Sequence, residues 1–94
     1  MGEKSGDLVA VWEVHLADGI HMIEFEHGTT SGRRLLRVDR NVVIKRDWMF
    51  KLVGSESFHL GKSRAQCTIR IDPVGGFAYE YSLEVSNFIL KKVE

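Results

Sequence analysis

The residues with the most chemical potential are four histidines, a single cysteine and a glycine-rich loop that ends in two arginines. Imidazole is the commonest metal-ligating side chain, and a cysteine thiolate is a nucleophile. Glycines beside guanidinium groups can hold phosphate or carboxylate. Each of these chemistries needs partners at particular spacings.

The histidine spacing argues against a metal site. His21 and His27 share one face of an expected strand but are six residues apart, about 20 Å at roughly 3.3 Å per residue, so one ion cannot bind both. The chain has no Cys-x-x-Cys, His-x-His or His-Glu-x-x-His motif. We expect these histidines to complete an apolar face near the strand ends, and we expect no metal and no cofactor.

Neither the cysteine nor the paired glutamates predict catalysis. Cys67 takes an inward position in an expected strand, where cysteine behaves as a small apolar residue; a reactive redox cysteine is the alternative. Glu13 is expected opposite Glu24 across a hairpin, but nothing in the sequence supplies a cleft that would raise one pKa. We therefore expect a solvated face, no catalytic residues and no enzymatic activity.

The loop from Gly28 to Arg34 is the most suggestive segment. It lacks the Gly-Lys-Ser/Thr ending of a phosphate-binding loop, and a strand rather than a helix is expected after it. A plain connection between strands is the simplest interpretation, and if the loop binds anything we expect a protein rather than a nucleotide. The candidate partner-binding residues are Thr29, Thr30, Ser31, Arg33 and Arg34.

Length and composition describe one small globular domain. The chain has 94 residues, of which 44% are hydrophobic and 28% charged, with 13 bases and 13 acids. It has no apolar run long enough to cross a membrane and no signal-peptide pattern at its start, and one cysteine suits a reducing compartment. We expect a loosely ordered stretch at residues 1–6, a single domain over residues 7–94 and a cytoplasmic location, with no membrane insertion; the oligomeric state stays open.

Charge is balanced overall but not along the chain. Residues 1–32 hold one base and six acids, a net of −5, whereas residues 33–46 hold six bases and one acid, a net of +5. Neighbouring strands could bring the two blocks together, each exposed pair contributing at most about 1 kcal/mol. We favour this interpretation over a strongly dipolar domain that attracts an oppositely charged partner.

Alternation with a period of two dominates the sequence and predicts strands. Asp18-Gly19 predicts a type I′ turn that places Trp12 opposite Phe25. A second turn is expected near 39–41, with its return strand pairing either Leu36 with Val43 or Leu35 with Ile44. A tight turn at 86–87 would place Val85 opposite Phe88 and Leu83 opposite Leu90.

Later aromatic residues fall into the same alternation. Residues 48–53 predict a central strand with Trp48 and Phe50 inward, and residues 77–85 predict another. The aromatic residues assigned to core positions are Trp48, Phe50, Phe77, Tyr79 and Tyr81. With these inward, the basic block from Arg33 to Arg46 has no stacking platforms, so we expect no nucleic-acid binding.

About eight strands with turn signals and no amphipathic helix predict an all-β fold, an antiparallel β-sandwich without significant helix. A small barrel is the alternative. Sheet edges could accept a partner strand, but the sequence does not say which strands are edges.

Four segments carry a family resemblance: residues 8–12 (LVAVW), 23–32 (IEFEHGTTSG), 48–54 (WMFKLVG) and 76–81 (GFAYEY). Through them the chain resembles the amino-terminal domain of the Fas apoptotic inhibitory molecule family. Members usually continue into a second β-rich domain. The resemblance implies a β-sandwich that serves as a cytosolic, non-enzymatic regulator and protects cells from death-receptor-triggered apoptosis, with links to neurite outgrowth and to suppression of protein aggregation.

The partners that the resemblance implies are proteins of the death-receptor pathway and aggregation-prone clients. The family offers no catalytic residue to transfer. At two turns, Arg40 and Ser86, the chain departs from the Asp-Gly and Asn-Gly pairs that the family tends to have, which predicts a shifted or longer loop at each. A small-ligand or anion-binding sandwich is the alternative function.

Overall fold

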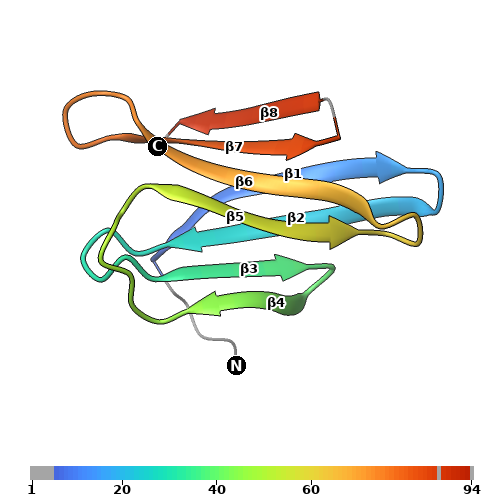
Figure 1. Cartoon of the computed structure of the whole chain (residues 1–94), viewed down its shortest axis with the longest axis horizontal. Coiled ribbons are helices and arrows are strands. Elements are labelled where there is room, and N and C mark those ends of the chain that lie inside the picture. The colour runs from blue at the N-terminus through green and yellow to red at the C-terminus, as the bar shows by residue number, and fades with distance from the viewer. Residues whose placement is uncertain (1–5, 87, 94) are drawn as a thin grey trace.

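The protein is a two-layer β-sandwich (Figure 1). The computed structural model describes residues 6–86 in full and the backbone of residues 88–93, and these residues form eight strands and no helix. The antiparallel sheets have the strand orders β1-β2-β3-β4 and β5-β6-β7-β8, so the predicted sandwich is confirmed. The strands are β1 (Leu8–Leu16), β2 (Gly19–His27), β3 (Arg34–Val38), β4 (Asn41–Arg46), β5 (Gly54–Leu60), β6 (Ala65–Pro73), β7 (Tyr79–Val85) and β8 (Phe88–Val93).

Within the described residues, no helix is long and apolar enough to cross a membrane. The loosely ordered start expected at residues 1–6 lies outside the described residues, except for Gly6, which is in a turn before β1.

The core lies between the sheets and follows the predicted alternation. Trp12, Phe25 and Tyr81, all predicted to face inward, are buried, and the rings of Phe25 and Tyr81 lie 6.1 Å apart between the two layers. Burying such aromatic side chains contributes on the order of 1.5 to 3 kcal/mol each. The core cluster is Ala10, Trp12, Val14, Ile23, Phe25, Leu36, Phe58, Leu60, Cys67, Ile69, Ile71, Tyr81, Leu83 and Val85.

The first hairpin turns one position earlier than predicted. Leu16 pairs with Gly19, so the two turn residues are Ala17 and Asp18 rather than Asp18 and Gly19. Asp18 is held in the turn because its carboxylate accepts hydrogen bonds from the Lys62 backbone N–H (2.9 Å) and from His21 (3.0 Å).

This register replaces the expected cross-strand partners but preserves the faces. Trp12 pairs with Ile23 rather than Phe25, and Glu13 pairs with Met22 rather than Glu24. Because each partner moves by two positions, every side chain stays on its predicted side of the sheet.

Val38 pairs with Asn41 and Val85 with Phe88 despite the lack of glycine between them, so the shifted or longer loops expected at Arg40 and Ser86 were wrong. Asp39 and Arg40 have φ angles of 50° and 72°, and Ser86 has 54°. The Asp39 carboxylate supports its turn by accepting hydrogen bonds from the Met22 backbone N–H (2.9 Å) and His21 (2.8 Å). At the other turn Val85 pairs with Phe88, as predicted.

Neither predicted pairing between β3 and β4 is correct. Leu36 pairs with Ile44, and Leu35 pairs with Lys45. The register shifts between Leu36 and Arg37, which leaves Val43 of β4 as the extra residue of a bulge.

The largest correction concerns the aromatic residues beyond β4. Residues 47–53 form no strand, Trp48 and Phe50 are 60% and 94% exposed, and Phe77 is fully exposed in the β6–β7 connection. Tyr79 is half-buried, whereas Tyr81 is buried as predicted. Residues 47–53 pass from one sheet to the other at the end of the sandwich (Figure 1), and the Trp48 and Phe50 side chains in this segment are left exposed.

Candidate functional site

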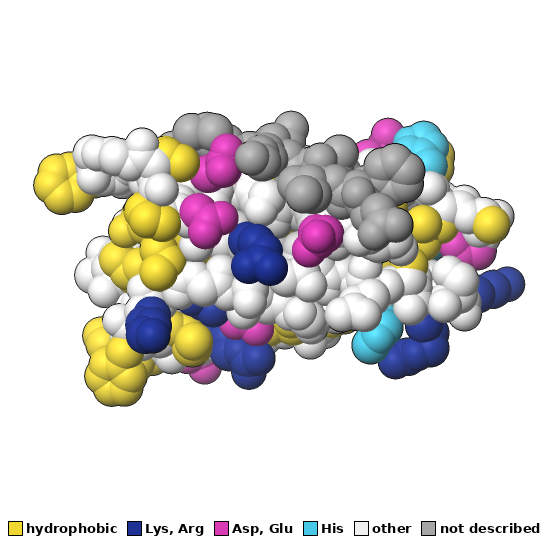
Figure 2. Space-filling model, turned by 45° about the horizontal axis from the view of Figure 1, so that its top comes forward, with side chains coloured by type: hydrophobic (Ala, Val, Ile, Leu, Met, Phe, Trp, Pro, Cys, Tyr) yellow, Lys and Arg dark blue, Asp and Glu magenta, His cyan; other side chains and the backbone are white. Residues whose placement is uncertain are grey.

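One end of the sandwich combines exposed aromatic side chains with backbone that is held in place. The β2–β3, β4–β5 and β6–β7 connections all lie at this end, on the left in Figure 1. Hydrophobic side chains gather there in Figure 2. We call residues 47–53 the crossover segment and this end of the molecule the aromatic end.

Trp48 and Phe50 line an open hollow in the crossover segment. Their rings meet edge to face with centroids 6.3 Å apart. The hollow has a volume of about 400 Å³. Its lining is Arg34, Trp48, Met49, Phe50, Lys51, Val53, Gly54 and Ser55, a mainly apolar set with two cations.

The crossover segment is fixed from below by the buried Arg34. Its Nη2 donates to the backbone carbonyls of Val53 (2.9 Å) and Lys51 (3.3 Å). The Met49 backbone N–H donates to the Ser31 carbonyl (3.0 Å), which ties the segment to the β2–β3 loop. The exposed aromatics therefore stand on ordered backbone.

Gly32 is required for this contact. Its φ is +75°, and a Cβ built on it would lie 2.3 Å from the Met49 carbonyl oxygen. Any other residue would push the loop and the crossover segment apart.

A buried carboxylate balances Arg34. Glu56 Oε2 accepts from Arg34 Nη1 (3.0 Å) and Arg46 Nε (3.2 Å), and Oε1 accepts from Arg46 Nη2 (3.0 Å). The Arg34 and Glu56 side chains are 3% and 6% exposed, while that of Arg46 is 50% exposed. Because β3 and β5 belong to different sheets, the triad bridges the two layers.

The triad also sets the protonation state of Glu56. Burial would raise the pKa of its carboxyl, but the hydrogen bonds from Arg46 and Arg34 and their positive charges outweigh burial and hold the pKa below its usual value. Glu56 therefore remains ionised where Arg34 needs a counter-charge.

The predicted partner-binding loop is brought next to the crossover segment, with its residues in different environments. Thr29 and Thr30 are exposed, and Ser31 is partly buried, its hydroxyl accepting a hydrogen bond from the Arg33 backbone N–H (3.2 Å). Arg34 is buried in the triad. The loop thus presents its two threonines outward, while Arg34 supports the neighbouring segment.

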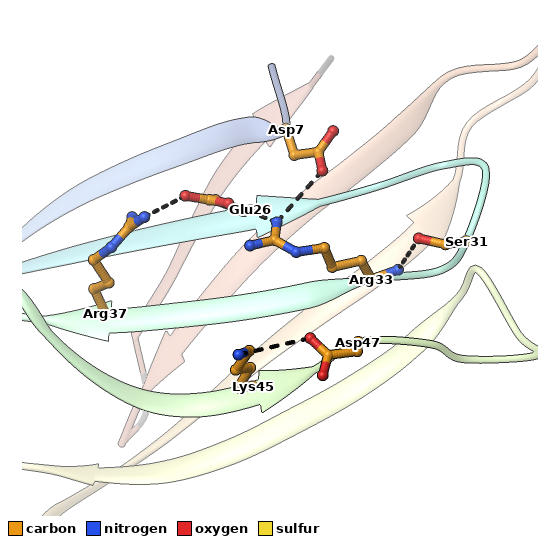
Figure 3. A network of polar contacts seen from close by, with 7 residues as sticks. All are labelled: Asp7, Glu26, Ser31, Arg33, Arg37, Lys45 and Asp47. Carbon is orange, nitrogen blue, oxygen red and sulfur yellow. Dashed lines mark hydrogen bonds and ion pairs between the residues drawn. The ribbon is translucent and has the colours of Figure 1, made fainter. Parts of the chain in front are cut away.

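Arg33 belongs to a second network on β2 and β3 (Figure 3). Glu26 lies between Arg33 (2.7 Å) and Arg37, and Arg33 also reaches Asp7 (3.4 Å). The hydrogen bond that Arg33 donates to the Glu26 carboxylate raises the pKa of Arg33. These pairs join the acidic and basic blocks across neighbouring strands, which confirms the intramolecular interpretation of the charge pattern.

The histidines are engaged within the fold. His27 is buried, and its Nδ1 lies 2.6 Å from the Tyr81 hydroxyl; burial and the Arg34 charge lower its pKa. His21 lies between the carboxylates of Asp18 and Asp39, and these hydrogen bonds raise its pKa. In the described part of the chain, no group of three or more His, Cys, Asp or Glu side chains is placed to hold a metal ion.

Cys67 is fully buried, as its inward position predicted. Burial raises the pKa of its thiol to about 11, so it is protonated at neutral pH. Glu13 and Glu24, which were expected opposite each other on a solvated face, are not cross-strand partners, because Glu13 pairs with Met22 and Glu24 with Val11.

Sequence reasoning missed the aromatic surface and its support. The one available signal was Glu56, a charged residue at an inward position of the alternation that continues with Phe58 and Leu60. Exposure of Trp48 and Phe50 also removes the premise on which nucleic-acid binding was excluded. The arrangement is chemically suited to binding, since it combines rigid aromatic surface with a few cations.

Comparison with known proteins identifies the family. A family model described as Fas apoptotic inhibitory molecule (FAIM1) matches residues 8–94. The chain is 61% identical over 90 residues to Fas apoptotic inhibitory molecule 1 of Bos taurus, covering 96% of this chain and 45% of that protein. It is 58% identical over 86 residues to the Homo sapiens protein of that name, covering 92% and 48%.

The chain thus spans about half the length of the curated relatives it matches. The two-layer fold expected from the resemblance is also the one observed. Because the match extends along nearly the whole chain, this protein belongs to the Fas apoptotic inhibitory molecule family.

Proposed function

We propose that this chain inhibits Fas-triggered apoptosis in the cytoplasm by binding other proteins, without catalysing a reaction. The observation that carries the proposal is the family match, because the relatives are named for this inhibition. Surface aromatics on ordered backbone at the aromatic end support a binding role, since such residues are enriched at protein interfaces.

Cell survival tests this function directly. Cells that express the 94-residue chain and are exposed to Fas ligand should survive better than cells with an empty vector, with protein levels matched by immunoblot. Equal death in both would reject the function for this chain. A longer relative run in parallel shows whether protection requires residues beyond those present here.

The predicted loop is included in the proposed binding surface. Thr29 and Thr30 are exposed beside the crossover segment, to which Ser31 is hydrogen-bonded. Changing both threonines to alanine should reduce recovery of partners in a pull-down from cytosol, whereas equal recovery would remove the threonines from the surface.

A small-ligand or anion site at this loop receives less support. Arg33 and Arg34, which an anion would require, are already bound by Glu26 and Glu56. Flat thermal shifts with phosphates, nucleotides and glycans are the expected result.

Suppression of aggregation is the second activity that we propose. The exposed apolar surface at the aromatic end can contact aggregation-prone chains. Substoichiometric addition of this protein should slow fibril formation by an unrelated amyloid-forming protein, and unchanged kinetics would argue against the activity.

A further inference from the structure

We propose that the hollow of the crossover segment binds a short peptide segment that has an apolar anchor side chain flanked by carboxylates. This inference rests on the proposed function and gives the binding surface a specific ligand chemistry. It follows from three features of the described residues: unburied aromatics, a rigid floor and a local excess of positive charge.

The first feature is apolar surface that the fold leaves uncovered. Phe50 is almost completely exposed and Trp48 is more than half exposed, and their edge-to-face contact leaves most of both rings to solvent. Large aromatics with few rotatable bonds are the usual anchors of protein interfaces. A hollow of about 400 Å³ has room for one or two side chains from a partner.

The second feature is preorganisation. Arg34 holds the carbonyls of Lys51 and Val53, and Ser31 holds the backbone of Met49. Because the backbone under the aromatics is already ordered, little conformational entropy is lost when a partner binds. A loop that merely happened to expose aromatics would not need such support.

The third feature is the charge around the hollow. Arg34 and Lys51 line the hollow, and Arg34 is joined through Glu56 to Arg46, so these three cations and one acid carry a net charge of +2. Lys51 lines the hollow and forms no ion pair with any side chain of residues 6–86. A carboxylate beside the anchor therefore finds a cation at the rim.

The same charges favour a peptide over a nucleic acid. Arg34 and Arg46 both bind Glu56. Lys45 is paired with Asp47, 3.9 Å away, and Figure 3 draws this ion pair. A polyanion needs several cations that contact phosphates at once, whereas one or two carboxylates need only Lys51 and the residual field of the triad.

Titration of labelled peptides into the 94-residue chain tests the inference. The probe is a short peptide with a central leucine-phenylalanine pair flanked by aspartates. The controls are the same peptide with lysine flanks, the same peptide with an alanine-alanine centre, and a single-stranded oligothymidine. We expect only the aspartate-flanked apolar peptide to bind, with affinity that falls as salt is added.

Three exposed substitutions locate the site. Phe50→Ala should weaken binding by about tenfold, the usual loss for an interface anchor. Lys51→Glu should lower the affinity for the aspartate-flanked peptide and raise the affinity for the lysine-flanked one. Ile20→Ala, an exposed apolar residue near the opposite turn, is the matched control and should leave affinity unchanged.

Several results would overturn the inference. These are equal binding of both charged peptides, binding of the oligonucleotide alone, or no binding of any probe. A further one is analytical ultracentrifugation showing that the Phe50 surface is covered by a second copy of this chain instead of the peptide. If the peptides do not bind but the chain still protects Fas-treated cells, the proposed function holds and another surface must carry it. Conversely, peptide binding without protection would reject the function and keep the site.

Discussion

Replacing Glu56 with alanine tests whether the buried triad joins the two sheets. The substitution removes the carboxylate that binds Arg34 and Arg46 and leaves the Arg34 charge, 3% exposed, without its counter-ion. Two backbone carbonyls remain as acceptors for Arg34. They satisfy hydrogen bonds but do not neutralise the charge.

The expected loss follows from these exposures. Breaking a buried ion pair by removing one partner costs about 3 to 5 kcal/mol. A chain of this length has a free energy of unfolding of roughly 5 to 14 kcal/mol at the usual stability per residue. Glu56→Ala should therefore remove a large share of the stability, whereas Arg46→Ala should cost about 1 kcal/mol or less, because Arg46 is half exposed and Glu56 keeps Arg34.

Urea unfolding at neutral pH, followed by tryptophan fluorescence, measures both variants. A loss of similar size in Glu56→Ala and Arg46→Ala would refute the reasoning that burial decides the effect. The double variant Arg34→Met, Glu56→Leu separates charge from packing: it should retain most of the stability but release the crossover segment and weaken the peptide binding proposed above.

The pKa of Glu56 adds a pH signature to the same prediction. Its folded pKa lies below the ordinary value of 4.5, so its contribution is present above pH 4.5 and is lost as the pH falls through the folded pKa. The wild-type chain should lose stability over this acidic range more steeply than Glu56→Ala does.

Three smaller predictions concern other parts of the fold. The hydrogen bonds to Asp18 and Asp39 raise the pKa of His21 above 6.5. The contribution of His21 to the free energy of unfolding is therefore full below pH 6.5 and is lost as the pH rises through the raised pKa. The urea midpoint of His21→Gln, measured as a function of pH, should lack this decline. Arg40→Gly should raise stability by about 0.5 to 1 kcal/mol in thermal unfolding, because glycine relieves the strain of a φ of 72°, and a loss would contradict the turn geometry. The buried thiol of Cys67, with a pKa of about 11, should resist a disulfide reagent at pH 8 until urea unfolds the chain; rapid native reaction would argue against its burial.

The alternation of apolar residues was a sound guide wherever another layer covers the strand. Trp12, Phe25 and Tyr81 follow it and are buried. The hairpin register was wrong by one turn position, yet the faces were correct, because a shift of two positions leaves each side chain on its own side.

The same pattern misled at Trp48 and Phe50. Alternation reports an extended backbone, in which side chains point to opposite sides. It does not report whether a neighbouring strand pairs with that backbone or whether a second sheet covers it. Residues 47–53 have the alternation but connect the two sheets without belonging to either, so Trp48 and Phe50 face solvent.

The candidate binding surface was only half visible in the sequence. The loop with Thr29 and Thr30 was found from its glycines and hydroxyl groups, and it does adjoin the crossover segment. The pairing of Arg34 with Glu56 was not found, because the two residues are 22 positions apart and belong to different sheets. Local patterns carry no information on such contacts.

The sequence alone determined that this chain is an antiparallel β-protein of the Fas apoptotic inhibitory molecule family, because strand periodicity and family segments are local properties of the chain. Tertiary structure alone decided which aromatics are buried and which are presented to partners. The physical reason is that burial depends on what the other layer covers. Arg34, whose charge is balanced by Glu56 from the opposite sheet, fixes the segment that leaves Phe50 in water.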